Sequence, residues 1–133
     1  MEFVSRQSIY FDMLDSLHMV HNAAYLILFE RARMDMAMTL SRRYGEEIIE
    51  WPCGIVHSEV NYRAPITEMQ EVRVTVAVAE IGETSVTFAH TVELADGTCA
   101  ADGKTVIVRM DPDTHQARPW SDRFRERLRP YLT

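Results

Sequence analysis

The stretch that decides the fold runs from Tyr10 to Arg33 and reads YFDMLDSLHMVHNAAYLILFERAR. A β-type segment ends here, a short polar loop carries Asp15, and Asn22 then opens an apolar run typical of a helix. This order places a carboxylate beside a helix N-terminus, whose first N–H groups have no partner within the helix. A carboxylate and carbonyl-binding donors are the groups needed to attack an ester or thioester.

The same stretch resembles the hotdog-fold acyl-CoA thioesterases, specifically the 4-hydroxybenzoyl-CoA thioesterase-like group. Their signature runs Asp-x-Asp, a small-residue loop, x-Asn/His-x-x-Tyr, and an aromatic-Glu-x-Ala-Arg tail. In this chain Asp15 matches the second Asp, Asn22 and Tyr25 match the next block, and residues 29–33 match the tail. Met13 stands where the family has its first Asp, and the adjacent Asp12 is a candidate for a shifted equivalent.

Outward from this stretch, the pattern predicts a first strand over residues 3–11, a loop over 12–22 and a long helix over 23–43. The apolar residues that recur at spacings of three or four predict the buried face of the helix: Tyr25, Phe29, Ala32, Met36 and Leu40. The apolar run 26–28 widens this face, so we expect the first half of the helix to be buried on most sides. Gly45 is the expected C-cap.

Period-two patterns then predict strands near 54–64, 71–81, 84–95 and 98–110, joined as an antiparallel meander. Gly82-Glu83 and the two-residue signal Asp96-Gly97 are the expected hairpin turns, and Ser121 is the expected N-cap of a short tail helix to about 128. Together with the resemblance, this order predicts an α+β hotdog fold, in which an antiparallel sheet of about five strands wraps a long central helix. We expect a single domain over residues 1–133.

Composition narrows the class of protein. The 133 residues are 47% hydrophobic and 26% charged, as in an ordinary globular protein, and the net charge of −6 argues against nucleic-acid binding. Cys53 and Cys99 lack metal-ligand spacing and read as reduced thiols. No signal core or membrane-length apolar run is present, so a cytoplasmic location without membrane attachment is expected.

Asp15 is the predicted catalytic residue, because the resemblance gives this position the role of nucleophile or general base. The alternative is an Asp that only caps a turn. Asn22 and the N–H groups from Val20 to Ala23 are the expected oxyanion donors, with a simple N-cap as the alternative for Asn22. His18 replaces a residue that is commonly Gly in the family, and it is a candidate acid or base or else a polar loop residue.

Two further residues are expected to contact substrate. Tyr25 matches a family position, although core packing is the commoner role for such a residue. Arg63 ends a strand that resembles the family's coenzyme A entrance, and a guanidinium suits phosphate geometry. Glu30 and Arg33 are expected to pair along the helix or across it.

The sequence therefore predicts an acyl-CoA thioesterase that releases a free acid and coenzyme A. The resemblance implies that it needs no metal or redox cofactor and works as a homodimer, with a tetramer of paired dimers as the larger alternative. A carrier-protein thioester is the alternative substrate. A hotdog-fold hydratase or dehydratase and a non-catalytic acyl-CoA-binding module are the alternative functions, because one fold hosts several activities.

Overall fold

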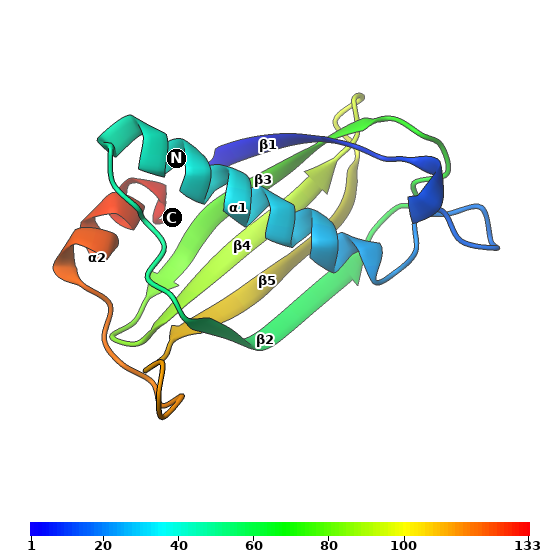
Figure 1. Cartoon of the computed structure of the whole chain (residues 1–133). Helices are drawn as coiled ribbons and strands as arrows, with labels where there is room; N and C mark the ends of the chain where they lie inside the picture. Colours follow the sequence, from blue (N-terminus) through cyan, green and yellow to red (C-terminus); the bar gives the residue numbers. More distant parts are fainter.

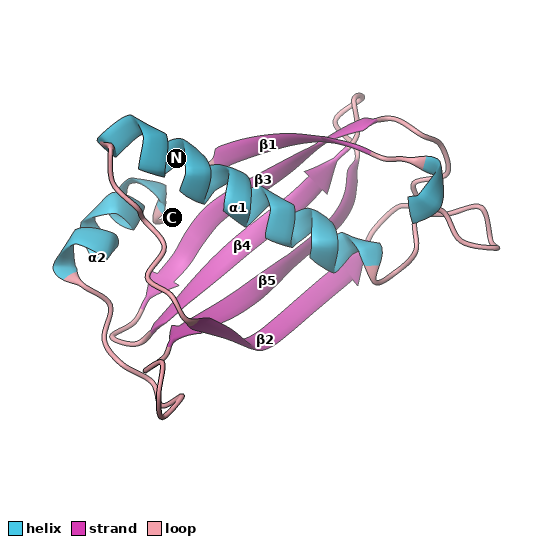
Figure 2. Cartoon of the chain, viewed as in Figure 1, coloured by secondary structure: helices cyan, strands magenta, loops and turns pink.

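The computed structural model describes residues 1–133 and has a five-stranded antiparallel sheet with a long helix across one face (Figure 1 and Figure 2). The strands are β1 (Phe3–Ser8), β2 (Cys53–Tyr62), β3 (Glu71–Ile81), β4 (Ser85–Glu93) and β5 (Cys99–Arg109). The helices are α1 (Ala24–Tyr44) and α2 (Asp122–Leu128), with 3-10 turns at Phe11–Met13 and Arg129–Tyr131. The predicted hotdog fold is confirmed.

The strand order is β1-β3-β4-β5-β2, which corrects one prediction. Strands β3, β4 and β5 form the expected meander, but β2 pairs with β5 at the edge of the sheet and not with β3. The connection from β2 to β3 is held against other loops, because Val20 N–H donates to the Ile66 carbonyl and Ile9 N–H to the Gln70 carbonyl. These bonds hold the connection at the end of the sheet, where the predicted meander would have placed β2 beside β3.

The buried face of α1 is the one the spacing predicted. Each of its five residues is at most 3% exposed: Tyr25, Phe29, Ala32, Met36 and Leu40. Gly45 ends the helix in the left-handed region with φ 64°, as expected of a C-cap. The expectation that the first half is buried on most sides is wrong, since Leu26 and Ile27 are 41% and 46% exposed. One sheet covers only one side of a helix.

The Phe29 side chain of α1 packs against the sheet where β5 carries a glycine. A Cβ on Gly103 would lie 2.1 Å from the Glu59 carbonyl oxygen and 2.9 Å from the Phe29 ring. His90 pairs with Gly103 across the β4–β5 ladder and stacks on the Phe29 ring at 4.5 Å between centroids. The glycine therefore makes room for an aromatic side chain and an imidazole to meet under the helix.

Element boundaries differ modestly from the predictions. Strand β1 ends at Ser8 because a 3-10 turn begins at Phe11, and Ser121 caps α2 as expected by accepting a bond from the Phe124 N–H at 3.1 Å. The β4–β5 turn spans more than two residues, since the closing bond joins Leu94 N–H to the Thr98 carbonyl. Gly97, with φ 87°, supplies the positive φ that this longer turn needs.

Candidate active site

The loop that carries Asp15 folds into a compact turn beside the start of α1. One carboxylate oxygen, Oδ1, accepts bonds from the N–H groups of Leu17 (2.8 Å) and Met19 (3.4 Å). The Asp15 backbone also bonds to both sides of the turn, donating to the Met19 carbonyl and accepting from the His18 N–H. The other oxygen, Oδ2, has no hydrogen-bond partner within the chain. Asp15 is thus both a turn residue and a carboxylate with a free oxygen.

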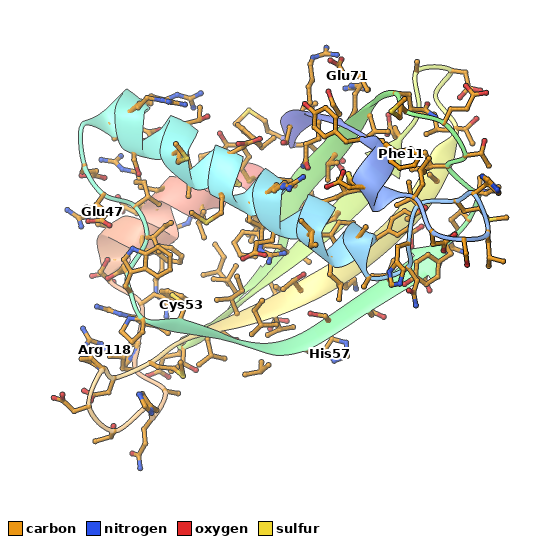
Figure 3. The ribbon with its side chains drawn as sticks, turned by 45° about the vertical axis from the view of Figure 1, so that its right-hand side comes forward. Phe11, Glu47, Cys53, His57, Glu71 and Arg118 are labelled. Atoms are coloured by element: carbon orange, nitrogen blue, oxygen red, sulfur yellow. The ribbon has the colours of Figure 1, made fainter.

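A cavity of about 470 Å³ at this end of the molecule brings together four of the five predicted site residues. Asp15, Asn22, Tyr25 and Arg63 line it, although Arg63 follows β2 and is separated from the Asp15 loop in sequence by the whole of α1. Figure 3 shows this end of the molecule near Phe11, away from the end that Glu47 marks. The volume falls within the usual range for a small-molecule site.

The free amide donors at the helix start are fewer than predicted. The N–H groups of Val20 and His21 donate to the carbonyls of Ile66 and Met13, and the Ala23 N–H points at the side chains of His21 and Asn22. The Asn22 N–H accordingly has no acceptor and is left as a donor for a ligand. The side-chain oxygen of Asn22 accepts a hydrogen bond from the Ala23 N–H at 3.0 Å. Asn22 is not the N-cap of α1, because Ala23 occupies that position.

Tyr62 is a site residue that the sequence did not single out. Its ring meets the Tyr25 ring edge-on at 5.2 Å, and its hydroxyl donates to the Asn22 carbonyl at 3.1 Å. The contact ties the end of β2 to the start of α1 across the cavity. Tyr25 is 3% exposed, and burial together with the nearby Tyr62 raises the pKa of its phenol. The only signal for Tyr62 was its place next to Arg63, at the strand end that resembles the family's coenzyme A entrance.

Arg63 lines the cavity but already has a partner. Its Nε donates to Asp102 Oδ2 at 3.0 Å and its Nη2 to Asp102 Oδ1 at 3.3 Å. These two bonds raise the pKa of Arg63 and lower that of Asp102. Asn61 also donates to Asp102, at 2.8 Å. A phosphate near Arg63 would therefore share the guanidinium with this carboxylate.

His18 is the predicted site residue that the structure sets apart. It is exposed, does not line the cavity, and adopts φ 60° in the turn after Asp15. A positive φ is uncommon for residues other than Gly, and His is among those that tolerate it. This explains why the resembling family commonly has Gly at the position. The geometry does not favour the prediction that His18 is an acid or base.

The predicted Glu30–Arg33 pair does not form. Arg33 Nη1 instead donates to the Thr105 hydroxyl at 3.0 Å and contacts His90 Nε2 at 3.3 Å, both on the sheet beneath the helix. His90 is 2% exposed, and burial together with the charge of Arg33 lowers its pKa to about 3. Helix spacing put Glu30 within reach of Arg33, but the sheet offered better partners on the buried side.

Comparison with known proteins places the chain in a family. The model of the thioesterase-like superfamily matches residues 11–128. A thioesterase from Thermus thermophilus, solved with coenzyme A and zinc, is 31% identical over 96% of this chain and 92% of that one, with a TM-score of 0.80. A search of curated proteins gives no significant match.

Two further solved structures share the fold at lower identity. A predicted thioesterase from Bacillus stearothermophilus is 23% identical, covers 100% of this chain and 98% of its own, and has a TM-score of 0.86. YbaW, a probable thioesterase from Escherichia coli, is 22% identical over 98% of this chain and 99% of its own, with a TM-score of 0.82. The chain belongs to the thioesterase-like superfamily and is a thioester hydrolase with the hotdog fold. No helix in it is long and apolar enough to cross a membrane.

Proposed function

We propose that this protein hydrolyses acyl-CoA thioesters in the cavity lined by Asp15, Asn22, Tyr25, Tyr62 and Arg63. The observation that carries the proposal is the juxtaposition of a carboxylate with a free oxygen and a helix start whose Asn22 N–H has no acceptor. The Thermus thermophilus relative was solved with coenzyme A, which supports the same leaving group here.

In the proposed mechanism Asp15 acts in one of two ways. As a general base it takes a proton from water, whose oxygen attacks the thioester carbon. As a nucleophile it forms a mixed anhydride that water then hydrolyses. In both routes the Asn22 N–H stabilises the oxyanion, the C–S bond breaks and the coenzyme A thiolate leaves. The thiolate takes its proton from the Asp15 carboxyl in the first route and from solvent in the second. A single oxyanion donor contributes about 3 kcal/mol to lowering such barriers. The residues supply these steps without a metal or redox cofactor.

A thiol-release screen across acyl-CoA thioesters tests the proposal. We expect hydrolysis by the wild type and its loss in Asp15→Asn, while Asp113→Asn, the same change at an exposed position that does not line the cavity, remains active. Acyl-carrier-protein thioesters in the same screen identify the carrier. Saturable binding without thiol release, or hydration of an enoyl-CoA in place of hydrolysis, would contradict the proposal.

We further propose a homodimer joined along β2, with a tetramer as its paired form. Strand β2 uses one edge to pair with β5 and leaves the other free, and its Ile55 and Val56 are 56% and 63% exposed. His57 lies on this strand (Figure 3). Free strand edges in native proteins are usually covered, and an isologous strand pair covers both copies at once.

Native mass spectrometry tests the assembly. We expect a mass of two or four times 15.4 kDa, and a shift toward the monomer in Val56→Glu, which puts a charge on an exposed edge position. Arg31→Glu, an exposed change on α1, is the control that keeps the wild-type mass. A wild-type mass of 15.4 kDa at micromolar concentration would refute the dimer.

The proposed location is the cytoplasm, where Cys53 and Cys99 stay reduced.

A further inference from the structure

A second cavity lies at the other end of α1. It has a volume of about 200 Å³ and shares no lining residue with the Asp15 cavity. It is bounded by α1 from Glu30 to Leu40, the 48–53 segment, β4, β5 and α2, toward the end of the molecule where Figure 3 labels Cys53. Of its 17 lining residues 14 are hydrophobic, including Met36, Ala37, Leu40, Phe88, Ile107 and Leu128.

The polar lining residues are Glu30, Arg33 and Glu50. They differ in whether an oppositely charged group within the chain pairs with them. Glu50 pairs with Arg109 at 3.0 Å and accepts bonds from the backbone N–H and hydroxyl of Ser121. Its charge is therefore matched within the fold. Glu30 is exposed to solvent and forms no ion pair.

Arg33 is a half-buried cation without an anionic partner. Only its Nη1 makes hydrogen bonds, to the neutral Thr105 hydroxyl and to His90, whereas Arg109 near the same cavity wall pairs with a carboxylate. Burial lowers the pKa of Arg33, and the nearby charge of Glu30 partly opposes that shift. A guanidinium stays charged at neutral pH, and leaving it desolvated and unpaired costs free energy. An arriving carboxylate would supply the missing partner.

We propose that this cavity binds a free aliphatic carboxylic acid, with its carboxylate on Arg33 and its chain among the apolar lining residues. At about 30 Å³ for each water-sized group, the volume of about 200 Å³ holds a chain of about seven carbons. With the carboxylate carbon at the wall beside Arg33, the acid that fits has about eight carbons. An apolar cavity with one charged group at its wall is the usual design of a site for such a ligand. Thioester hydrolysis releases acids of this class, but the site is argued without reference to that activity.

Tryptophan fluorescence gives a direct readout, because both tryptophans of the chain, Trp51 and Trp120, line this cavity. Octanoate is the probe and octanamide its neutral match, each titrated into the full-length protein and checked by calorimetry. We expect saturable octanoate binding and affinity for octanamide lower by about tenfold or more, the usual value of a hydrogen bond to a charged group. Equal affinity for acid and amide, or no binding of octanoate, overturns the proposal.

Variants then test which residues bind the carboxylate of the ligand and which bind its aliphatic chain. Arg33→Gln should abolish the preference for the acid, whereas Arg31→Gln, the same charge change at an exposed helix position, should keep it. Ala37→Leu, which fills the cavity, should weaken acid and amide alike. Loss of acid preference in Arg31→Gln, or unchanged binding in Ala37→Leu, would contradict the assignment. None of these measurements uses thiol release, so they stand or fall separately from the proposed hydrolysis.

Discussion

The two cavities toward opposite ends of α1 are lined by different kinds of residues. Asp15 lies in an exposed turn whose hydrogen bonds are mostly to the backbone, and the lining of the cavity beside it mixes the polar side chains of Asp15, Asn22 and Arg63 with apolar ones. The cavity around Leu40 is walled by the hydrophobic core itself. The contrast teaches that the first region presents a carboxylate on a surface loop, whereas the second cannot be altered without altering the packing that stabilises the fold.

The sharpest way to test this contrast is to truncate the apolar wall. Leu40 is 1% exposed, so Leu40→Ala should lower the free energy of unfolding by about 3 kcal/mol through lost burial and an enlarged void. Chemical denaturation measures the change. Met38→Ala, at a half-exposed helix position, is the control and should cost far less. A loss below about 1 kcal/mol for Leu40→Ala would mean that this wall is not part of the stabilising core.

The opposite result is expected at Asp15. An Asn there still accepts the bonds from the Leu17 and Met19 N–H groups, so stability should be unchanged. Turnover should fall by about two orders of magnitude or more, because both basicity and nucleophilicity are lost. Steady-state kinetics and a thermal melt of the same sample separate the two effects. Near-normal turnover, or lost activity that tracks lost folding, would break the comparison.

The third prediction concerns His90, which is buried under α1 between the two cavities, and the pH dependence of the free energy of unfolding. Its pKa of about 3 lies below the usual 6.5, so between these values the unfolded chain binds a proton that the folded chain does not. Stability therefore falls as the pH drops through this window, by about 2 kcal/mol at pH 5 relative to pH 7.5. Denaturation of wild type and His90→Leu at several pH values measures the slope, which the variant should flatten. His115→Asn, an exposed change, should retain it.

The smallest expected effect is at Arg63, on the rim of the proposed catalytic cavity. Arg63→Ala should raise KM for acyl-CoA by about threefold to tenfold and leave kcat near wild type, since a distant phosphate contact adds uniform binding. Asp102→Asn should lower KM, because it releases the guanidinium from its present partner. Comparison with a short pantetheine thioester completes the test. Equal losses on both substrates would mean that Arg63 holds the fold or the dimer and not the nucleotide.

The buried face of the helix and the fold could be predicted from the sequence. The spacing of Tyr25, Phe29 and Leu40 predicted the buried face of α1, and the resemblance of the Tyr10–Arg33 stretch predicted the fold. Helix periodicity and turn residues act over a few positions, so one chain is enough to see them. The roles of Asp15, Asn22 and Arg63 stay predictions, although the structure does place these residues around one cavity.

Only the tertiary structure decided which groups meet across the fold. It moved β2 beside β5, joined Tyr62 to the start of α1, and turned Arg33 away from Glu30 toward the sheet. It also showed that the N–H groups of Val20 and His21 donate to carbonyls outside the helix. Each of these contacts joins residues far apart in sequence or competes with a local alternative. The sequence determined the elements and the candidate site residues, and packing decided their partners, because hydrogen bonds and burial are settled only when distant segments come together.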